Sequence, residues 1–174
     1  MCNEADFKRS IHARFSLFGI ETEDCGKKIL PVVGGEKLGL EIRYDPGMYD
    51  TERVYIETHI RGNYQKDKYM EAGIWFSDGV HLYGVGNFRS LYVFEKAQLQ
   101  FAHLLAKNPS YGMTDVEFEI KESGKGFTIS ERMAEEWAEF HIHYKHKFIA
   151  DFKAFSPLIR FLTGFERPTL KQWR

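Results

Sequence analysis

Short runs in which apolar and polar residues alternate one by one restrict most strongly how this chain can fold. In residues 54–60, VYIETHI, every second residue is apolar or Thr, and the residues between them are Tyr, Glu and His. A period of two is typical of a β-strand with one buried face. Residues 11–17, IHARFSL, and residues 115–130, DVEFEIKESGKGFTIS, also alternate in this way, so the sequence predicts strands there as well.

Glycine-containing turns separate the predicted strands. Residues 28–44, KILPVVGGEKLGLEIRY, read as two short strands around a Gly-Gly pair. In residues 73–86, GIWFSDGVHLYGVG, the pair Asp78-Gly79 predicts a tight hairpin, because Asp-Gly readily adopts the positive φ angles of a type I′ turn. We expect a further turn at residues 123–126, SGKG.

Two segments show helix signals instead. Between residues 94 and 105 apolar residues recur at three- and four-residue steps, and the run stops before Pro109. The recurring residues, which we expect to form the buried stripe, are Phe94, Ala97, Phe101, Leu104 and Leu105. Residues 156–164, SPLIRFLTG, begin with a Ser-Pro pair suited to an N-cap and first helical position and end on a glycine. The sequence therefore predicts a mid-chain helix and a C-terminal helix.

These elements predict a single α+β domain over residues 1–174. We expect a curved antiparallel sheet (a meander, a sandwich or a partly closed barrel) covered by the two helices. The aromatic share of 16% supplies large buried areas, so the core requires neither disulfides nor metal. The order of elements is similar to that of small bacterial immunity-type proteins, although no residue motif supports a family assignment.

Several features predict a cytoplasmic protein without membrane contact. The first ten residues, MCNEADFKRS, lack the apolar stretch of a secretory signal, and no run approaches the ~18 apolar residues that cross a bilayer. Cys2 and Cys25 form no CxxC pair and require no oxidising compartment. The formal net charge of −1 creates no field that would attract nucleic acid or an anionic membrane.

Residues 138–148, AEFHIHYKHKF, fit two secondary structures. As a strand, Phe140 and Ile142 would be buried and would alternate with polar residues. As a helix, residues at four-residue steps between Met133 and Phe152 would form one apolar stripe. We favour the strand, because the alternation is unbroken and because Ile142 would interrupt the polar side of a helix.

The histidines of this segment raise the question of a metal site. In the strand, His141 and His143 would lie on one face about 7 Å apart, close enough to share Zn²⁺ or another divalent ion. In the helical alternative, Glu139, His143 and His146 would share a face. Two lysines on the same strand face would repel a cation. The sequence therefore favours a solvated His/Lys face with no cofactor, and a metal site at His141, His143 and His146 is the alternative.

Charge is segregated along the last third of the chain. Residues 115–139 contain eight acidic and three basic residues, whereas residues 141–174 contain seven basic and two acidic residues. The simpler interpretation pairs Glu117 and Glu119 with Lys145 and Lys147 across a strand ladder. A basic, aromatic-rich C-terminal segment could instead bind RNA, but nucleic-acid-binding domains usually have a basic overall balance that this chain lacks.

No catalytic motif accompanies these features. GVGNFR, residues 84–89, lacks the third glycine of a dinucleotide loop, and SGKG lacks the frame of a P-loop. No serine lies in a GxSxG elbow, and Cys25 follows acidic residues that disfavour a thiolate. The sequence therefore leans against an enzyme.

Three functions remain as ranked hypotheses. The first is a non-catalytic binding or interaction protein of the immunity type, whose unknown protein partner would contact surface tyrosines. The tyrosines in question are Tyr49, Tyr55, Tyr64 and Tyr69. The second is a small-molecule or divalent-metal site at the mouth of the sheet. Its candidate ligands are His59, His81, His141 and His143. The third is nucleic-acid binding through the C-terminal segment.

Overall fold

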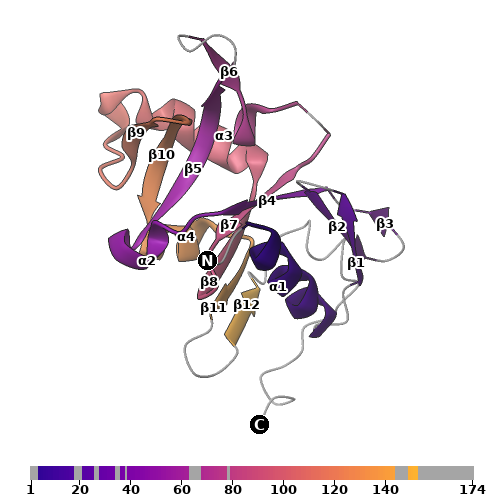
Figure 1. Ribbon diagram of the computed structural model, residues 1–174. Helices are drawn as coiled ribbons and strands as arrows, with labels where there is room; N and C mark the ends of the chain where they lie inside the picture. Colours follow the sequence, from indigo (N-terminus) through magenta and orange to yellow (C-terminus); the bar gives the residue numbers. More distant parts are fainter. Residues whose placement is uncertain are drawn as a thin grey trace.

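The fold combines two β-sheets with helices packed against them (Figure 1). The computed structural model of the protein describes residues 4–17, 21–25, 28–33, 36–37, 39–62, 68–77, 79–143 and 149–152. The α+β prediction is confirmed, and the sheets do not close into a barrel. The predicted C-terminal helix at residues 156–164 lies outside the described residues.

The first sheet has eight strands in the order β1-β2-β4-β7-β8-β11-β12, with β3 paired to β2. Its strands are β1 (Glu21–Cys25), β2 (Lys28–Val33), β3 (Glu36–Lys37), β4 (Leu40–Tyr44), β7 (Leu82–Gly86), β8 (Ser90–Glu95), β11 (Phe140–His143) and β12 (Ile149–Phe152). Neighbouring strands are antiparallel except β4 and β7, which are parallel. A purely antiparallel sheet was predicted, so this pair is a departure from it.

The second sheet is antiparallel and has four strands in the order β6-β5-β10-β9. These are β5 (Arg53–Arg61), β6 (Tyr69–Glu71), β9 (Glu117–Lys121) and β10 (Gly124–Ser130). The helices are α1 (Glu4–Leu17), α2 (Met48–Thr51), α3 (Lys96–Ala106) and α4 (Glu131–Trp137), and two 3₁₀ turns are η1 (Gly73–Trp75) and η2 (Pro109–Tyr111).

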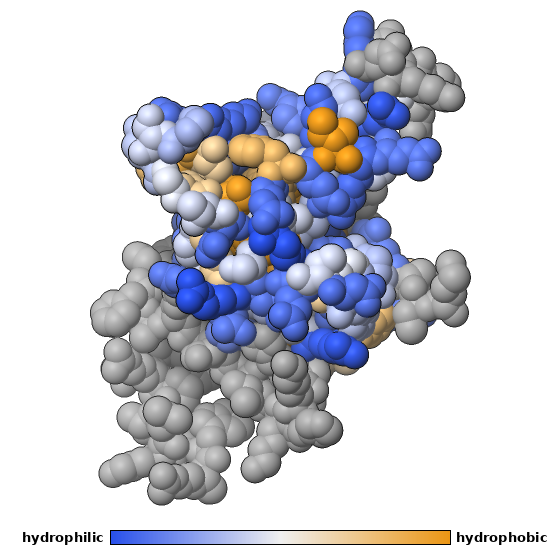
Figure 2. Space-filling model, turned by 90° about the vertical axis from the view of Figure 1, so that its left-hand side faces the viewer, coloured by the Kyte–Doolittle hydropathy of each residue, from blue (hydrophilic) through white to orange (hydrophobic). Residues whose placement is uncertain are grey.

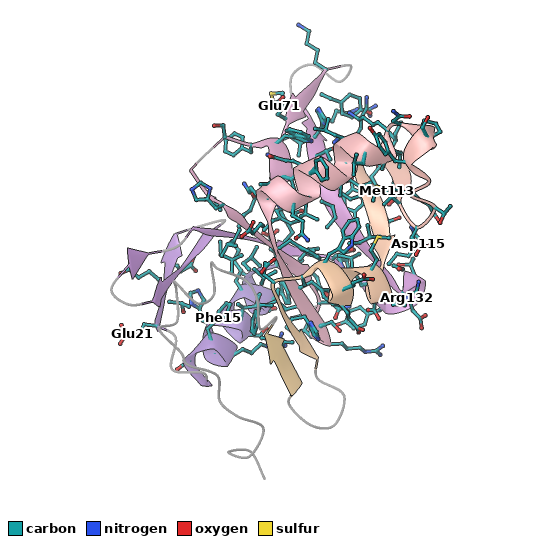
Figure 3. The ribbon with its side chains drawn as sticks, turned by 180° about the vertical axis from the view of Figure 1, so that it is seen from behind. Phe15, Glu21, Glu71, Met113, Asp115 and Arg132 are labelled. Atoms are coloured by element: carbon teal, nitrogen blue, oxygen red, sulfur yellow. The ribbon has the colours of Figure 1, made fainter. Side chains whose placement is uncertain are left out.

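Apolar side chains cover both faces of the first sheet. On one face, residues from β4, β8 and β11 pack against α1. Phe15, labelled in Figure 3, belongs to this layer, and its ring stacks on that of Phe140 with a centroid distance of 5.9 Å. On the other face, Tyr83, Val85, Tyr92 and Phe94 pack against the second sheet, α3 and α4. The alternation along β7 and β8 therefore serves two cores instead of one core and solvent.

The strand predicted at residues 11–17 is wrong, because this segment is the second half of α1. Phe7, Ile11 and Phe15 recur at four-residue steps, and all three are buried against the first sheet. Ala13, which the strand prediction placed on the buried face, is exposed. The alternation was coincidental, and the helical period becomes visible only when Phe7 is included.

The hairpin predicted around Asp78-Gly79 is also wrong. Residues Gly73–Trp75 form η1 instead of a strand, and Gly73 and Gly79 both have positive φ angles, of 53° and 72°. The tight hairpin lies one strand later, between β7 and β8. There the Asn87 side chain accepts hydrogen bonds from the backbone N–H groups of Arg89 and Ser90, at 2.8 and 3.0 Å, which stabilises the turn.

Other strand predictions are confirmed. β5 buries Val54, Ile56 and Thr58 on one face as expected, and β9 and β10 form a hairpin. Its turn was predicted at residues 123–126 but lies at residues 122–123, because β10 already begins at Gly124. The ladder predicted to pair Glu117 and Glu119 with Lys145 and Lys147 rests on these two lysines, which lie outside the described residues. β9 pairs with β10 in the second sheet, whereas β11 lies in the first.

Candidate functional site

The histidine-rich segment is a strand where the structure describes it. In β11, Phe140 and Ile142 are buried against α1, and His141 lies on the opposite face across from Tyr92. The extended interpretation of residues 140–143 is therefore confirmed. His141 is half-buried, with its ring centroid 6.1 Å from that of Tyr92. The side chain of His143 and the whole of His146 lie outside the described residues.

The other predicted site histidines lie on different elements. His81 is exposed just before β7, and its carbonyl accepts a hydrogen bond from the Lys96 N–H. β7 and β11 flank β8 on opposite sides. His81 lies across from Lys96, directly after β8, and His141 lies across from Tyr92, four residues earlier. These two histidines are therefore separated by more than about 13 Å.

His59 lies in the second sheet, away from the first-sheet histidines. It is paired with Glu71 on β6 and with Lys125 on β10. Burial lowers its pKa, partly offset by the nearby Glu71. Within the described part of the chain, no three His, Cys, Asp or Glu side chains come together in a way that could hold a metal ion. The predicted four-histidine site is not assembled among these residues.

A cleft of about 470 Å³ lies beside α3 and includes one of the predicted residues, His81. Its walls come from η1, the segment before β7 and the first turns of α3. The Gln100 side chain donates a hydrogen bond of 2.7 Å to the Ile74 carbonyl, which ties α3 to η1 along one wall. Glu95 and Lys96 contribute charged groups.

A buried chain of alternating charges extends inward from this cleft. The Lys96 ammonium lies 2.9 Å from a carboxylate oxygen of Glu41. The other oxygen of Glu41 lies 2.9 Å from the Arg43 guanidinium, which lies 2.9 Å from Glu57 as well. The side chains of Lys96 and Glu41 are each only 6% exposed. Two cations and two carboxylates therefore neutralise one another where β4, β5 and α3 meet.

The surroundings of this network keep its hydroxyl and guanidinium groups in their ordinary protonation states. Burial raises the pKa of Tyr83, whose hydroxyl accepts a hydrogen bond of 3.3 Å from the Glu57 N–H. Burial alone would lower the pKa of Arg43, but Tyr83, Glu57 and Glu41 outweigh it, and the pKa is raised. The arrangement holds three elements together.

His103 is buried on the inner side of α3. Its Nδ1 accepts a hydrogen bond of 3.1 Å from the Trp75 indole N–H, and its ring stacks on Phe127 at 5.5 Å. Burial, with smaller effects of Lys107 and His59, lowers its pKa to about 4. The imidazole is therefore neutral at pH 7 and carries its proton on Nε2. In the sequence, the four-residue spacing between Leu99 and His103 is the signal that could have indicated that His103 shares the buried side of the helix.

The outer face of α3 is apolar, contrary to the predicted orientation of this helix. The helix buries Leu99, Ala102 and His103, whereas Phe101 and Leu104 of the predicted buried stripe are exposed. Apolar residues occur on both sides of the helix, so their spacing fits either orientation. The contacts of His103 and the ion pair of Lys96 decide which side faces inward.

Neighbouring elements continue this apolar face. β9 is beside α3, because the His103 ring lies 5.7 Å from that of Phe118, and η2 also contacts α3. Five large apolar side chains on these elements are 50–72% exposed. We call them the apolar surface: Phe101, Leu104, Tyr111, Phe118 and Ile120. Figure 2, which faces the side of β9, shows hydrophobic side chains gathered among hydrophilic ones there.

The tyrosines predicted to face a partner are engaged within the chain. Cationic groups lie over the rings of three of them: Arg89 over Tyr49 at 4.8 Å, Lys121 over Tyr55 at 3.7 Å, and Lys125 over Tyr69 at 3.7 Å. Such contacts stabilise each ring where it lies. Tyr64 lies outside the described residues.

None of the helices in the described ranges has the length and apolar character needed to cross a membrane. Searches with the chain against protein-family models, curated proteins and solved structures found no match.

Proposed function

We propose that the chain is a non-catalytic, cytoplasmic interaction protein that binds a protein partner through the apolar surface on α3, η2 and β9. The observation that supports this proposal is the exposure of five large apolar side chains on adjoining elements. Contiguous exposed apolar patches on folded proteins commonly mark binding sites. Aromatic side chains are enriched at such interfaces, and three of the five residues here are aromatic.

The chemistry of the cleft supports binding over catalysis. Its buried cation, Lys96, is neutralised by Glu41. An immunity-type role, in which this protein covers a surface of another protein, is one form of the proposal. The apolar surface would then be covered in the complex.

The proposal predicts that two charges placed on α3 abolish partner binding. In Phe101→Glu/Leu104→Glu, two carboxylates replace the exposed apolar groups, and a partner that covers them would have to desolvate both charges. A hot-spot residue at the centre of an interface contributes about 2 kcal/mol or more. If even one of the two residues is such a hot spot, affinity falls by at least ~30-fold. The measurement is affinity capture from cells expressing the chain, followed by titration of the recovered partner.

The matched control places the same two charges at the same spacing on another exposed helix face. Ala13 and Ser16 are exposed on α1, so Ala13→Glu/Ser16→Glu should bind as the unchanged protein does. Thermal unfolding should show that both variants are folded. A partner that both variants retain, or both lose, would argue against a role of this surface.

A further inference from the structure

β9 is an unprotected edge of the second sheet. Among the described residues it pairs with β10 on one side and with no strand on the other, and Figure 1 shows it at the outer margin of the molecule. Proteins usually blunt such edges with proline, bulges, charged side chains or very short strands. The five residues of β9, EFEIK, contain no proline. The charges alternate with Phe118 and Ile120, which are at least half exposed.

The backbone of β5 determines which groups of β10 are already used. The N–H groups of Tyr55 and Glu57 donate to side chains outside the second sheet. Successive residues in a strand direct their backbone groups to opposite sides, so Ile56 directs its N–H and C=O to its partner Phe127 on β10. The N–H and C=O of Phe127 are therefore engaged with β5.

It follows that β9 presents free hydrogen-bonding groups at its outer edge. Because Phe127 bonds to β5, its pair with Phe118 on β9 is of the non-hydrogen-bonded kind. The N–H and C=O of Phe118 therefore point away from β10, and those of Ile120, two residues on, do the same. These groups can pair with a further strand.

The sequence of β9 is complementary to itself in one antiparallel register. If two copies pair about Glu119, each Glu117 lies opposite Lys121 of the other copy, and each Phe118 lies opposite Ile120 of the other copy. In this register the outward backbone groups also match, because Phe118 and Ile120 form the hydrogen-bonded pairs. Opposite charges and apolar pairs across neighbouring strands are both stabilising.

The neighbouring two-fold registers are poorer. Pairing about Phe118 places Glu117 opposite Glu119 of the other copy. Pairing about Ile120 places Glu119 opposite Lys121 of the other copy, but it places Phe118 opposite Glu122, which lies in the turn beyond β9.

In the favoured register the two Glu119 side chains face each other, each with Lys121 of its own copy at 3.7 Å. Within each copy Glu117 also lies 3.2 Å from the Arg53 guanidinium, and Lys121 lies over the Tyr55 ring. The charge pairs between copies therefore form in competition with these contacts.

We propose that two copies of this chain associate through their β9 edges, joining two four-stranded sheets into one across a two-fold axis. The inference rests on the proposed function in that β9 belongs to the apolar surface, and it names a second copy as the partner of that edge. Pairing would bring Phe118 and Ile120 of both copies together on the side of α3. The resulting interface is isologous, as in most homodimers.

The first test is a charge exchange between the copies, with oligomeric state measured by sedimentation over a range of concentrations. The unchanged chain should form dimers as concentration rises. Glu117→Lys places like charges opposite each other at both ends of the interface, and so does Lys121→Glu. Each variant alone should dissociate at least ~10-fold more readily. An equimolar mixture should regain dimers, because opposite charges then face each other again.

The second test removes one of the backbone N–H groups at the outer edge of β9. Ile120→Pro removes an N–H that β10 does not use, so the chain should fold, as thermal unfolding would show, and should remain monomeric. A monomeric unchanged chain, a mixture that does not regain dimers, or dimers that persist in Ile120→Pro would each overturn the inference. The α3 variants test the proposed function separately, so failure of either idea is recognised on its own.

Discussion

Glu41→Gln is expected to lower the free energy of unfolding by about 3–5 kcal/mol, because it leaves a buried ammonium without its counter-charge. Glu41 is the one carboxylate of the network that contacts both Lys96 and Arg43, each at 2.9 Å. Arg43 keeps Glu57 after the substitution, whereas Lys96 loses the carboxylate that lies 2.9 Å from its ammonium and retains the carbonyl of Phe76, at 3.5 Å. Urea unfolding at pH 7 measures the loss.

A double-mutant cycle shows whether this effect comes from the pair. Lys96→Met should be less harmful than Glu41→Gln, because Glu41 remains paired with Arg43 and a methionine fills much of the same space. In the double variant no ammonium is left uncompensated. The two losses should therefore fail to add, with a coupling energy of about 1–3 kcal/mol.

A pair on the surface provides the comparison. Asp6 contacts Arg9 one turn along α1, and the Arg9 side chain is largely exposed. Asp6→Asn should change stability by less than about 1 kcal/mol. Additive losses in the buried cycle, or an equal effect of Asp6→Asn, would show that burial of the Glu41–Lys96 pair is not what makes it important.

Acidification is expected to destabilise the protein through His103. In the unfolded chain this imidazole binds a proton near its ordinary pKa of 6.5, whereas in the folded protein burial lowers its pKa to about 4. Between these values the unfolded state binds more protons, so stability is highest above pH 6.5 and falls as pH decreases towards 4. At pH 4.5 the contribution of His103 is a loss of roughly 2–3 kcal/mol relative to pH 7.

The measurement is the pH profile of unfolding free energy for the unchanged chain and for His103→Gln. The variant has no titrating group here, and its amide oxygen can accept from the Trp75 indole, so its profile should be flatter between pH 7 and 4.5. His59, whose pKa burial also lowers, titrates in both proteins, and its smaller electrostatic effect on His103 belongs to the difference that is measured. Parallel profiles for His103→Gln and the unchanged chain would refute the role of His103.

The sequence was informative where one face of an element is buried and the other is polar. β5 and β11 have this character, and their alternation predicted them correctly. The alternation also located the β9–β10 hairpin, although the apolar residues of β9 are exposed. Prediction from the sequence failed where the spacing of the apolar residues fits two different arrangements. Residues 11–17 fit a strand as well as the end of α1, and α3 has apolar residues on both sides.

The predicted and observed site residues differ for a related reason. A cluster of histidines is visible in a sequence, but convergence depends on strand order, and β8 separates the elements of His81 and His141. Glu41, Arg43 and Glu57 occupied alternating strand positions that normally face solvent. The second sheet and α3 pack over them, and this long-range packing leaves no mark in the local pattern.

The two sheets are interleaved along the chain, and this affects how the protein acquires its structure. The chain leaves the first sheet after β4 to form β5 and β6, returns for β7 and β8, and leaves again for β9 and β10 before β11. Neither sheet can be completed from one contiguous stretch. Contact order is correspondingly high, so folding in roughly milliseconds to seconds is the expected regime. A chain cut between α3 and β9 would leave each fragment with an incomplete version of both sheets.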